Sequence, residues 1–229
     1  MSPKFVAADV AFFKAWEFCT EEERNRLQDL NPNFQQKATG HPCIVLKTDG
    51  RYALITTVSA HGSGDYNDWC PPWKRGHPSN WKRRDRYRAF KGTERPHRGR
   101  AFLRLSKGAW PKTRGSWVNV ETVLLVPVDL LVFFTNAWGF DWYSNRYIPQ
   151  VDQESFRDLL QHIAEANREW SAMVRRWKEL GVPAEEEQPP APPSRPLPPT
   201  PPTTLPKQVV APSAPSSVGK LSWAMVARG

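Results

Sequence analysis

YALITTV, residues 52–58, is rich in β-branched residues, and CIVL, residues 43–46, is a shorter apolar run ahead of it. Asp49 and Gly50 lie between the two runs and are residue types that favour a tight turn. The pattern therefore predicts a β-hairpin in which Ile44–Lys47 pairs with the second run.

Three further segments of the chain have strand-like patterns. Ala101–Leu105 and Ser116–Val126 are expected to be strands, and Asp129–Phe134 is read as either a fifth strand or a short helix. Together with the hairpin, these segments predict a small β-structure in the middle of the chain.

Helices are expected on both sides of the strands. Asp9–Phe18 is read as a short helix, and a second helix begins after Thr20, which forms a capping box with Glu23. Asp152–Leu180 is the clearest helix, because its apolar residues recur every three or four positions. This helix is expected to pack on the strands, and a coiled-coil dimer is the alternative.

Composition divides the chain into four segments. Residues 1–37 are a helical segment, residues 38–148 a β-domain, and residues 149–181 the amphipathic helix. Residues 182–229 form a tail that has thirteen prolines between positions 183 and 215. Such a segment cannot bury enough apolar surface to offset its ordering entropy, so we expect it to be disordered.

Basic residues are concentrated in one part of the chain. The formal net charge is +9, and residues 74–104 contain twelve Lys and Arg against two acidic residues. Most of them fall in a long loop, residues 61–100, in which aromatic side chains are interleaved with the cations. Guanidinium groups pair with phosphates and aromatic faces stack on unpaired bases, so the loop predicts binding to nucleic acid, RNA rather than duplex DNA. The candidate contacts are Trp73, Trp81, Lys82, Arg83, Arg84, Arg86, Tyr87, Arg88, Arg98 and Arg100.

Other readings of the loop are burial of its aromatic side chains against the β-domain, or binding to an anionic lipid or protein. No apolar run is long enough to span a bilayer and the N-terminus has no secretion signal, so we expect an intracellular protein, cytoplasmic or nuclear. Three widely spaced cysteines are typical of free thiols in a reducing compartment. Since no paired metal-ligand spacing or nucleotide-binding motif occurs, we expect neither a metal nor a cofactor.

Part of the chain resembles a known family. GHPCIVL at residues 40–46, a turn, and ALITTVS at residues 53–59 are similar to the opening of MazF/PemK-type toxins, and the resemblance covers about residues 38–135. It implies a small SH3-like β-barrel that acts on single-stranded RNA. The expected fold is therefore α+β, with an SH3-like barrel flanked by N-terminal helices and a long C-terminal helix, followed by the disordered tail.

The resemblance also implies candidate catalytic residues. Family members commonly have an arginine just before the proline that takes part in catalysis, and His41 stands at that position here. Thr57, or alternatively Thr56, matches the family's threonine at the end of the strand. Metal-independent cleavage needs a base and a cation. The candidates for the base are His41 and His61, and those for the cation are Arg88, Arg98 and Arg100.

These observations favour an RNA-binding protein with ribonuclease ancestry, and they leave its competence for cleavage open. A protein-interaction adaptor is the alternative, because Ser194-Arg195-Pro-Leu-Pro-Pro199 resembles the ligands of SH3 or WW domains. Trp223 lies in a short apolar motif near the end of the tail, which is a second candidate interaction site.

Overall fold

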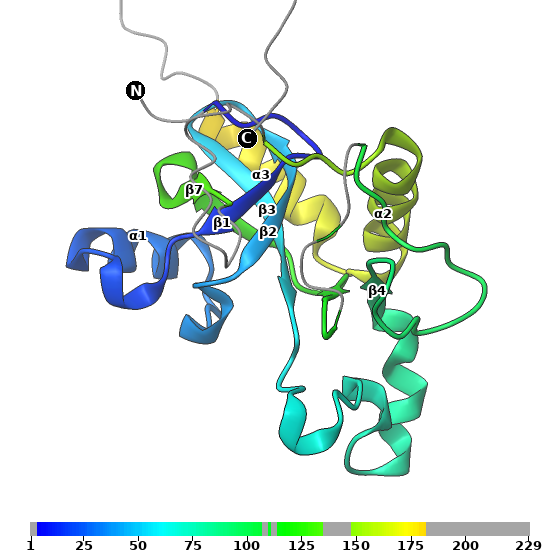
Figure 1. Ribbon diagram of the computed structural model, residues 1–229. Coiled ribbons are helices and arrows are strands. Elements are labelled where there is room, and N and C mark those ends of the chain that lie inside the picture. Colours follow the sequence, from blue (N-terminus) through cyan, green and yellow to red (C-terminus); the bar gives the residue numbers. More distant parts are fainter. Residues whose placement is uncertain (1–3, 107–109, 111–113, 135–147, 182–229) are drawn as a thin grey trace, which may run out of the picture. The chain divides into compact units, whose positions relative to one another are not determined.

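The computed structural model describes residues 4–106, 110, 114–134 and 148–181 (Figure 1). By its internal contacts the chain separates into two units, residues 1–186 and 187–229, and all of the described residues belong to the first. The predictions for the proline-rich tail, which include the Arg195–Pro199 ligand and the Trp223 motif, lie outside the described residues.

The strands form one open antiparallel sheet, which together with the helices gives the predicted α+β class (Figure 1). Within the described residues six of the seven strands lie in the order β4-β5-β3-β2-β1-β7, and the seventh, β6, pairs with a further part of β3. A closed SH3-like barrel is not shown, because β6 and β7 do not pair in this part of the chain. The strands are β1 Val10–Phe13, β2 Pro42–Thr48, β3 Tyr52–Ser59, β4 Tyr87–Ala89, β5 Trp117–Asn119, β6 Leu124–Pro127 and β7 Leu131–Phe133.

Helices precede and follow most of the strands along the chain. The α-helices of the described residues are α1 Glu21–Leu30, α2 Gln153–Ala166 and α3 Trp170–Gly181. The 3-10 helices are η1 Trp16–Phe18, η2 Gln36–Ala38, η3 Asp65–Asn67, η4 Pro72–Lys74, η5 Pro78–Arg86 and η6 Val128–Leu130. None of the described helices is long and apolar enough to cross a membrane.

The predicted hairpin is confirmed as β2 and β3. Their antiparallel register places Cys43 opposite Thr57. Asp49 holds the turn between the strands, since its Oδ1 accepts hydrogen bonds of 2.8 Å from the backbone N–H groups of Arg51 and Tyr52. The residue type that predicted the turn therefore also forms the hydrogen bonds that stabilise it.

Alternate residues of the hairpin pack into two hydrophobic cores. Ile44 and Leu54 belong to the core that includes residues of α2 and packs against α3. Cys43 and Ile55 belong to the other core, to which α1 contributes Leu27. Because neighbouring strand residues point to opposite faces, both faces of the hairpin are covered, and both strands are apolar almost throughout.

A short connection limits how far the sheet can open. β6 and β7 are the two ends of the path β6-β3-β2-β1-β7, and only η6 joins them. Five flat strands would separate their outer members by about 19 Å, whereas the three residues of η6 allow a span of roughly 14 Å at most. The sheet must therefore curl until these two ends are close.

The capping box predicted at the start of α1 is confirmed. The Thr20 hydroxyl accepts from the Glu23 N–H at 3.2 Å, and the Glu23 carboxylate accepts from the Thr20 N–H at 2.7 Å. Both bonds satisfy backbone donors that would otherwise lack a partner at the helix start.

The single helix predicted over residues 152–180 is wrong, because the segment forms two helices. Asn167 ends α2, and its Oδ1 accepts from the Glu169 N–H at 2.9 Å at the start of the next helix. Its Nδ2 also donates to the Glu121 carbonyl at 3.0 Å, which fixes the break to the turn after β5. The expected packing on the sheet is present, since Leu159 of α2 is fully buried in the first core.

The helix predicted over Asp9–Phe18 is also wrong. Val10–Phe13 is strand β1, which pairs with both β2 and β7, and only η1 is helical. Because β1 is a central strand with little exposed surface, its apolar residues do not alternate with polar ones, and periodicity could not separate a strand from a helix.

Four other predicted segments differ in detail. Ser116–Val126 contains two strands, β5 and β6, and Ala101–Leu105 makes only isolated bridges. Asp129–Phe134 contains both alternatives, the end of η6 and then β7. The predicted loop over residues 61–100 contains η3, η4, η5 and β4, so much of it has a regular backbone.

Candidate nucleic-acid interface and adjoining pocket

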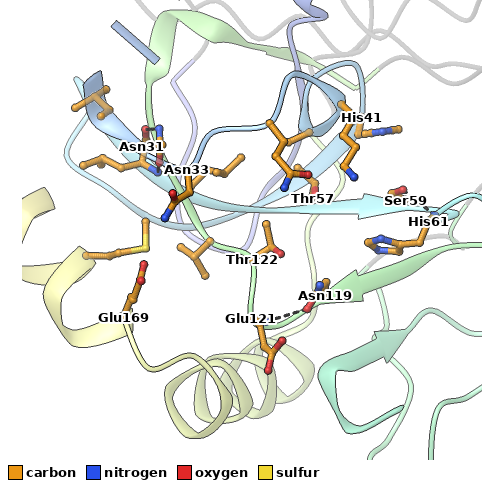
Figure 2. A pocket seen from close by; sticks show the side chains of 18 of the residues that line it. Asn31, Asn33, His41, Thr57, Ser59, His61, Asn119, Glu121, Thr122 and Glu169 are labelled. Carbon is orange, nitrogen blue, oxygen red and sulfur yellow. Dashed lines mark hydrogen bonds between the residues drawn. The ribbon is translucent and has the colours of Figure 1, made fainter. Parts of the chain in front are cut away.

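A pocket of about 950 Å³ opens beside the end of β3. His41, Thr57 and His61, the three residues predicted for catalysis, all line it, so the fold brings them together (Figure 2). The hairpin register explains this, because the pairing of Cys43 with Thr57 sets the entry of β2 beside the exit of β3. We call this cavity the β3 pocket.

His61 lies partly buried, with a left-handed backbone conformation, at the edge of the β3 pocket. Its φ of +48° is uncommon for a residue other than glycine. Its N–H donates to the Ser59 Oγ at 2.9 Å, and its Nε2 lies 3.2 Å from the Trp117 carbonyl oxygen. Burial lowers the pKa of His61 to about 4, so the ring is neutral at pH 7 and Nε2 carries the proton that the carbonyl accepts. A histidine with so low a pKa is a weak general base.

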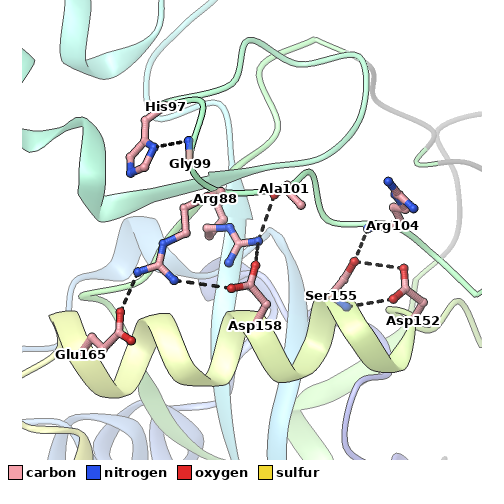
Figure 3. Close-up of polar contacts among 10 residues, drawn as sticks. Arg88, His97, Gly99, Ala101, Arg104, Asp152, Ser155, Asp158 and Glu165 are labelled. Atoms are coloured by element: carbon pink, nitrogen blue, oxygen red, sulfur yellow. Dashed lines mark hydrogen bonds and ion pairs between the residues drawn. The ribbon is translucent and has the colours of Figure 1, made fainter.

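The structure does not bring the three candidate arginines to the β3 pocket. Arg88 is only 1% exposed, and its Nη2 donates to Asp158 at 2.5 Å and to the Ala101 carbonyl at 3.0 Å (Figure 3). Arg100 pairs with the same carboxylate at 3.4 Å and with Glu165 at 2.6 Å. Both arginines therefore join the basic segment to α2, and their predicted role in contacting RNA does not fit the burial of Arg88.

Charged residues that the sequence did not mark line the β3 pocket as well. Glu121 and Glu169 contribute carboxylates, and Lys37 and Arg176 contribute cations. They come from the turn after β5, the start of α3, η2 and the middle of α3, so no local pattern could have grouped them. The pocket is thus mixed in charge rather than uniformly basic.

Two of the aromatic candidates are partly or wholly used inside the fold. Trp73 is 1% exposed and packs edge-on against Trp117, with ring centroids 5.6 Å apart. Stacking of an RNA base on Trp73 does not fit this burial. Tyr87 is half-buried, packs against Trp73 and lines the β3 pocket, so part of its ring is accessible there.

η5 carries one exposed part of the basic segment. Trp81 is 47% exposed, and the Arg84 guanidinium lies 5.1 Å from the centroid of its ring. Lys82 and Arg83 are exposed, and within the described residues neither has an acidic partner. We call these four residues the η5 surface. Arg86, the last residue of η5, instead pairs with Glu121 at 2.9 Å.

A second cavity of about 820 Å³ adjoins the η5 surface. It is lined by Trp81, Arg84, Arg95 and Arg98, together with residues that include the acids Asp85 and Glu94. Arg98, which was predicted to bind nucleic acid, is exposed here. The η5 surface therefore has a hollow beside its aromatic ring, in which basic residues outnumber the two acids.

No protein-family model, curated protein or solved structure matches this chain. The resemblance to MazF/PemK-type toxins therefore rests on the residues quoted above. In the part of the chain that the structure describes, no group of three or more His, Cys, Asp and Glu residues is placed to hold a metal ion.

Proposed function

We propose that this chain binds single-stranded RNA through the η5 surface. The observation that carries the proposal is the exposed Trp81 ring with the Arg84 guanidinium beside it. An unstacked base needs a flat aromatic face, and its phosphate needs a nearby cation, so the pair offers both parts of one nucleotide contact.

The 3-10 geometry of η5 arranges the side chains in rows. Residues three apart eclipse one another in such a helix, which aligns Trp81 with Arg84 and Arg83 with Arg86. The cations thus lie along an exposed 3-10 helix, and not along an α-helix or a β-ribbon of the kind that enters the major groove of DNA. This arrangement suits a flexible single strand better than duplex DNA.

We also propose that the sheet derives from an SH3-like barrel that has opened between β6 and β7. The short η6 connection supports this, because it keeps the two ends of the sheet within reach of each other. The resemblance to MazF/PemK-type toxins over residues 38–135 supports RNA as the ligand. Cleavage is not part of the proposal, since the base candidate His61 has a pKa near 4 and the predicted arginines lie elsewhere.

Fluorescence anisotropy with a labelled oligouridine of about 12 nucleotides tests the proposal. Titrations run at about 50 mM and about 200 mM salt, because phosphate contacts weaken steeply with salt. The double variant Lys82→Gln/Arg83→Gln should bind at least about tenfold more weakly at low salt, and its salt slope should fall by about 1.4. The variant Trp81→Ala should lose about fivefold or more.

The matched control is Arg157→Gln/Arg175→Gln, which removes two cations that are equally exposed on α2 and α3. It should bind as the wild type does. Equal losses in the two double variants would mean that net charge alone drives binding, and the η5 surface would be rejected as the interface. The same oligomer made of DNA shows whether the 2′-hydroxyl contributes.

A further inference from the structure

The β3 pocket has the size and lining of a site for a small flat molecule. Its volume of about 950 Å³ is within the range of pockets that hold small ligands. Leu30, Val123 and Met173 contribute apolar walls, and Tyr87 and His61 contribute rings that lie edge to face with centroids 5.3 Å apart. Such a lining favours a planar group with polar edges.

Thr57 supplies a hydrogen-bonding group that the protein leaves unused. Its side chain is only 7% exposed and lines the β3 pocket (Figure 2). Within the described residues its hydroxyl has no hydrogen-bond partner. The hydroxyl can both donate and accept, so a ligand in the pocket can form a hydrogen bond with it.

The carboxylates of the pocket limit what the ligand can be. Lys37 and Arg176 match the two carboxylates in charge, so the lining does not select an anion or a cation by net charge, and the hydrogen-bonding groups of the wall decide what fits. Carboxylates only accept hydrogen bonds, and the ligand must therefore present N–H donors. Among unpaired bases, guanine presents two adjacent donors on its Watson–Crick edge, which one carboxylate accepts together.

The β3 pocket lies next to the C-terminal end of η5. Arg86, the last residue of η5, pairs with Glu121 on the pocket wall at 2.9 Å, and Tyr87 follows it directly in the pocket lining. A strand that follows η5 towards its C-terminal end is therefore directed to the pocket. The rim beside it is fixed, because Arg75 donates to the Gly62 carbonyl at 2.9 Å and also to the His61 carbonyl.

From these observations we propose that the β3 pocket holds one unstacked guanine base of the strand that η5 binds. The Thr57 hydroxyl bonds to the base, and the Glu169 carboxylate accepts from its N1–H and 2-amino group. Glu169 is the assigned acceptor because, in the described part of the chain, its carboxylate has no ion pair, whereas Glu121 is paired with Arg86. This assignment rests on the proposed function, and it adds a base preference to it.

The test compares four labelled oligomers: oligouridine, and versions in which one central uridine is replaced by G, A or C. A bidentate contact that selects a base is expected to favour the G version by about fivefold to a hundredfold. Glu169→Gln and Thr57→Val should each reduce this preference, while their affinity for oligouridine stays at the wild-type value. Glu154→Gln is the control, because it removes an exposed carboxylate of α2 outside the pocket. Circular dichroism melts show that each variant is folded.

The outcomes separate the two proposals. Binding of oligouridine without a preference for G overturns the guanine assignment and leaves the η5 surface standing. A G preference that survives in Glu169→Gln and in Thr57→Val also overturns it. If no oligomer binds, the proposed function fails. A titration with guanosine, followed by ligand-observed NMR, then tests separately whether the β3 pocket binds the base. Saturable binding that Glu169→Gln abolishes supports the assignment, and no binding overturns it.

Discussion

Replacing Asp158 with asparagine tests how much the contact between the basic segment and α2 stabilises the fold. Arg88 is 1% exposed, and its charge is balanced by Asp158 at 2.5 Å. Its Nε and Nη1 have no hydrogen-bond partner within the described residues. Burial lowers the pKa of Arg88, and Asp158 opposes that shift, so the carboxylate is what makes the buried charge tolerable.

The expected loss follows from these contacts. Breaking a buried ion pair from one side costs about 3–5 kcal/mol, because the remaining charge is left uncompensated. Asp158 itself is 33% exposed and the Ala101 carbonyl still accepts from Arg88, so we expect the lower end, about 3 kcal/mol of unfolding free energy. Arg88→Met/Asp158→Leu should cost less than Asp158→Asn alone, since it removes both charges together.

Urea denaturation followed by circular dichroism and tryptophan fluorescence measures these free energies. Glu165→Gln is the control, because its pair with Arg100 is half-exposed and is expected to contribute less than about 1 kcal/mol. A loss for Asp158→Asn no larger than that of the control would refute the view that α2 is fixed by a buried charge.

Three further results are expected. Thr20→Ala should lower the unfolding free energy by about 1 kcal/mol through loss of the cap on α1, measured by urea denaturation, and an unchanged value would show that the cap contributes nothing. Burial lowers the pKa of His61 and of His162 to about 4, and the unfolded value is near 6.5. Since the unfolded chain then binds more protons, the contribution of these two histidines to stability should be fully present above pH 6.5 and be lost towards pH 4, by roughly 3 kcal/mol for each histidine at most. His61→Gln should reduce that fall in denaturation runs across this pH range. Finally, the purified wild type should leave single-stranded RNA intact on a gel, with or without a chelator, and robust cleavage would contradict the weak base assigned to His61.

Local signals in the sequence were enough for some elements. The hairpin was predicted because Asp49 and Gly50 mark a turn between two runs rich in β-branched residues. The start of α1 was predicted because the side chains of Thr20 and Glu23 each accept a hydrogen bond from the other residue's backbone N–H. Each of these signals lies within a few residues of the element that it predicts. These predictions therefore do not depend on which distant segments pack against the element.

Elements that depend on distant partners were missed. The break between α2 and α3 is fixed by Asn167 bonding to the Glu121 carbonyl, 46 residues away, while the apolar periodicity runs on through it. The same applies to the candidate sites. The pairing of Arg88 opposite Val118 buries the arginine, and only the tertiary fold brings Glu169 beside the end of β3.

The basic segment therefore has two separable roles, although its composition alone suggests a single one. Arg88 and Arg100 face carboxylates of α2, so their charges are neutralised inside the fold. Lys82 and Arg83 on η5 are exposed and, within the described residues, have no acid to neutralise them, so they remain available to a polyanion. Substitution of the first pair should then lower stability, whereas substitution of the second should weaken RNA binding and its salt dependence without changing stability. Stability and RNA binding are measured in separate assays. A variant that changed both the unfolding free energy and the RNA affinity would therefore show that the RNA surface and the α2 contact are coupled.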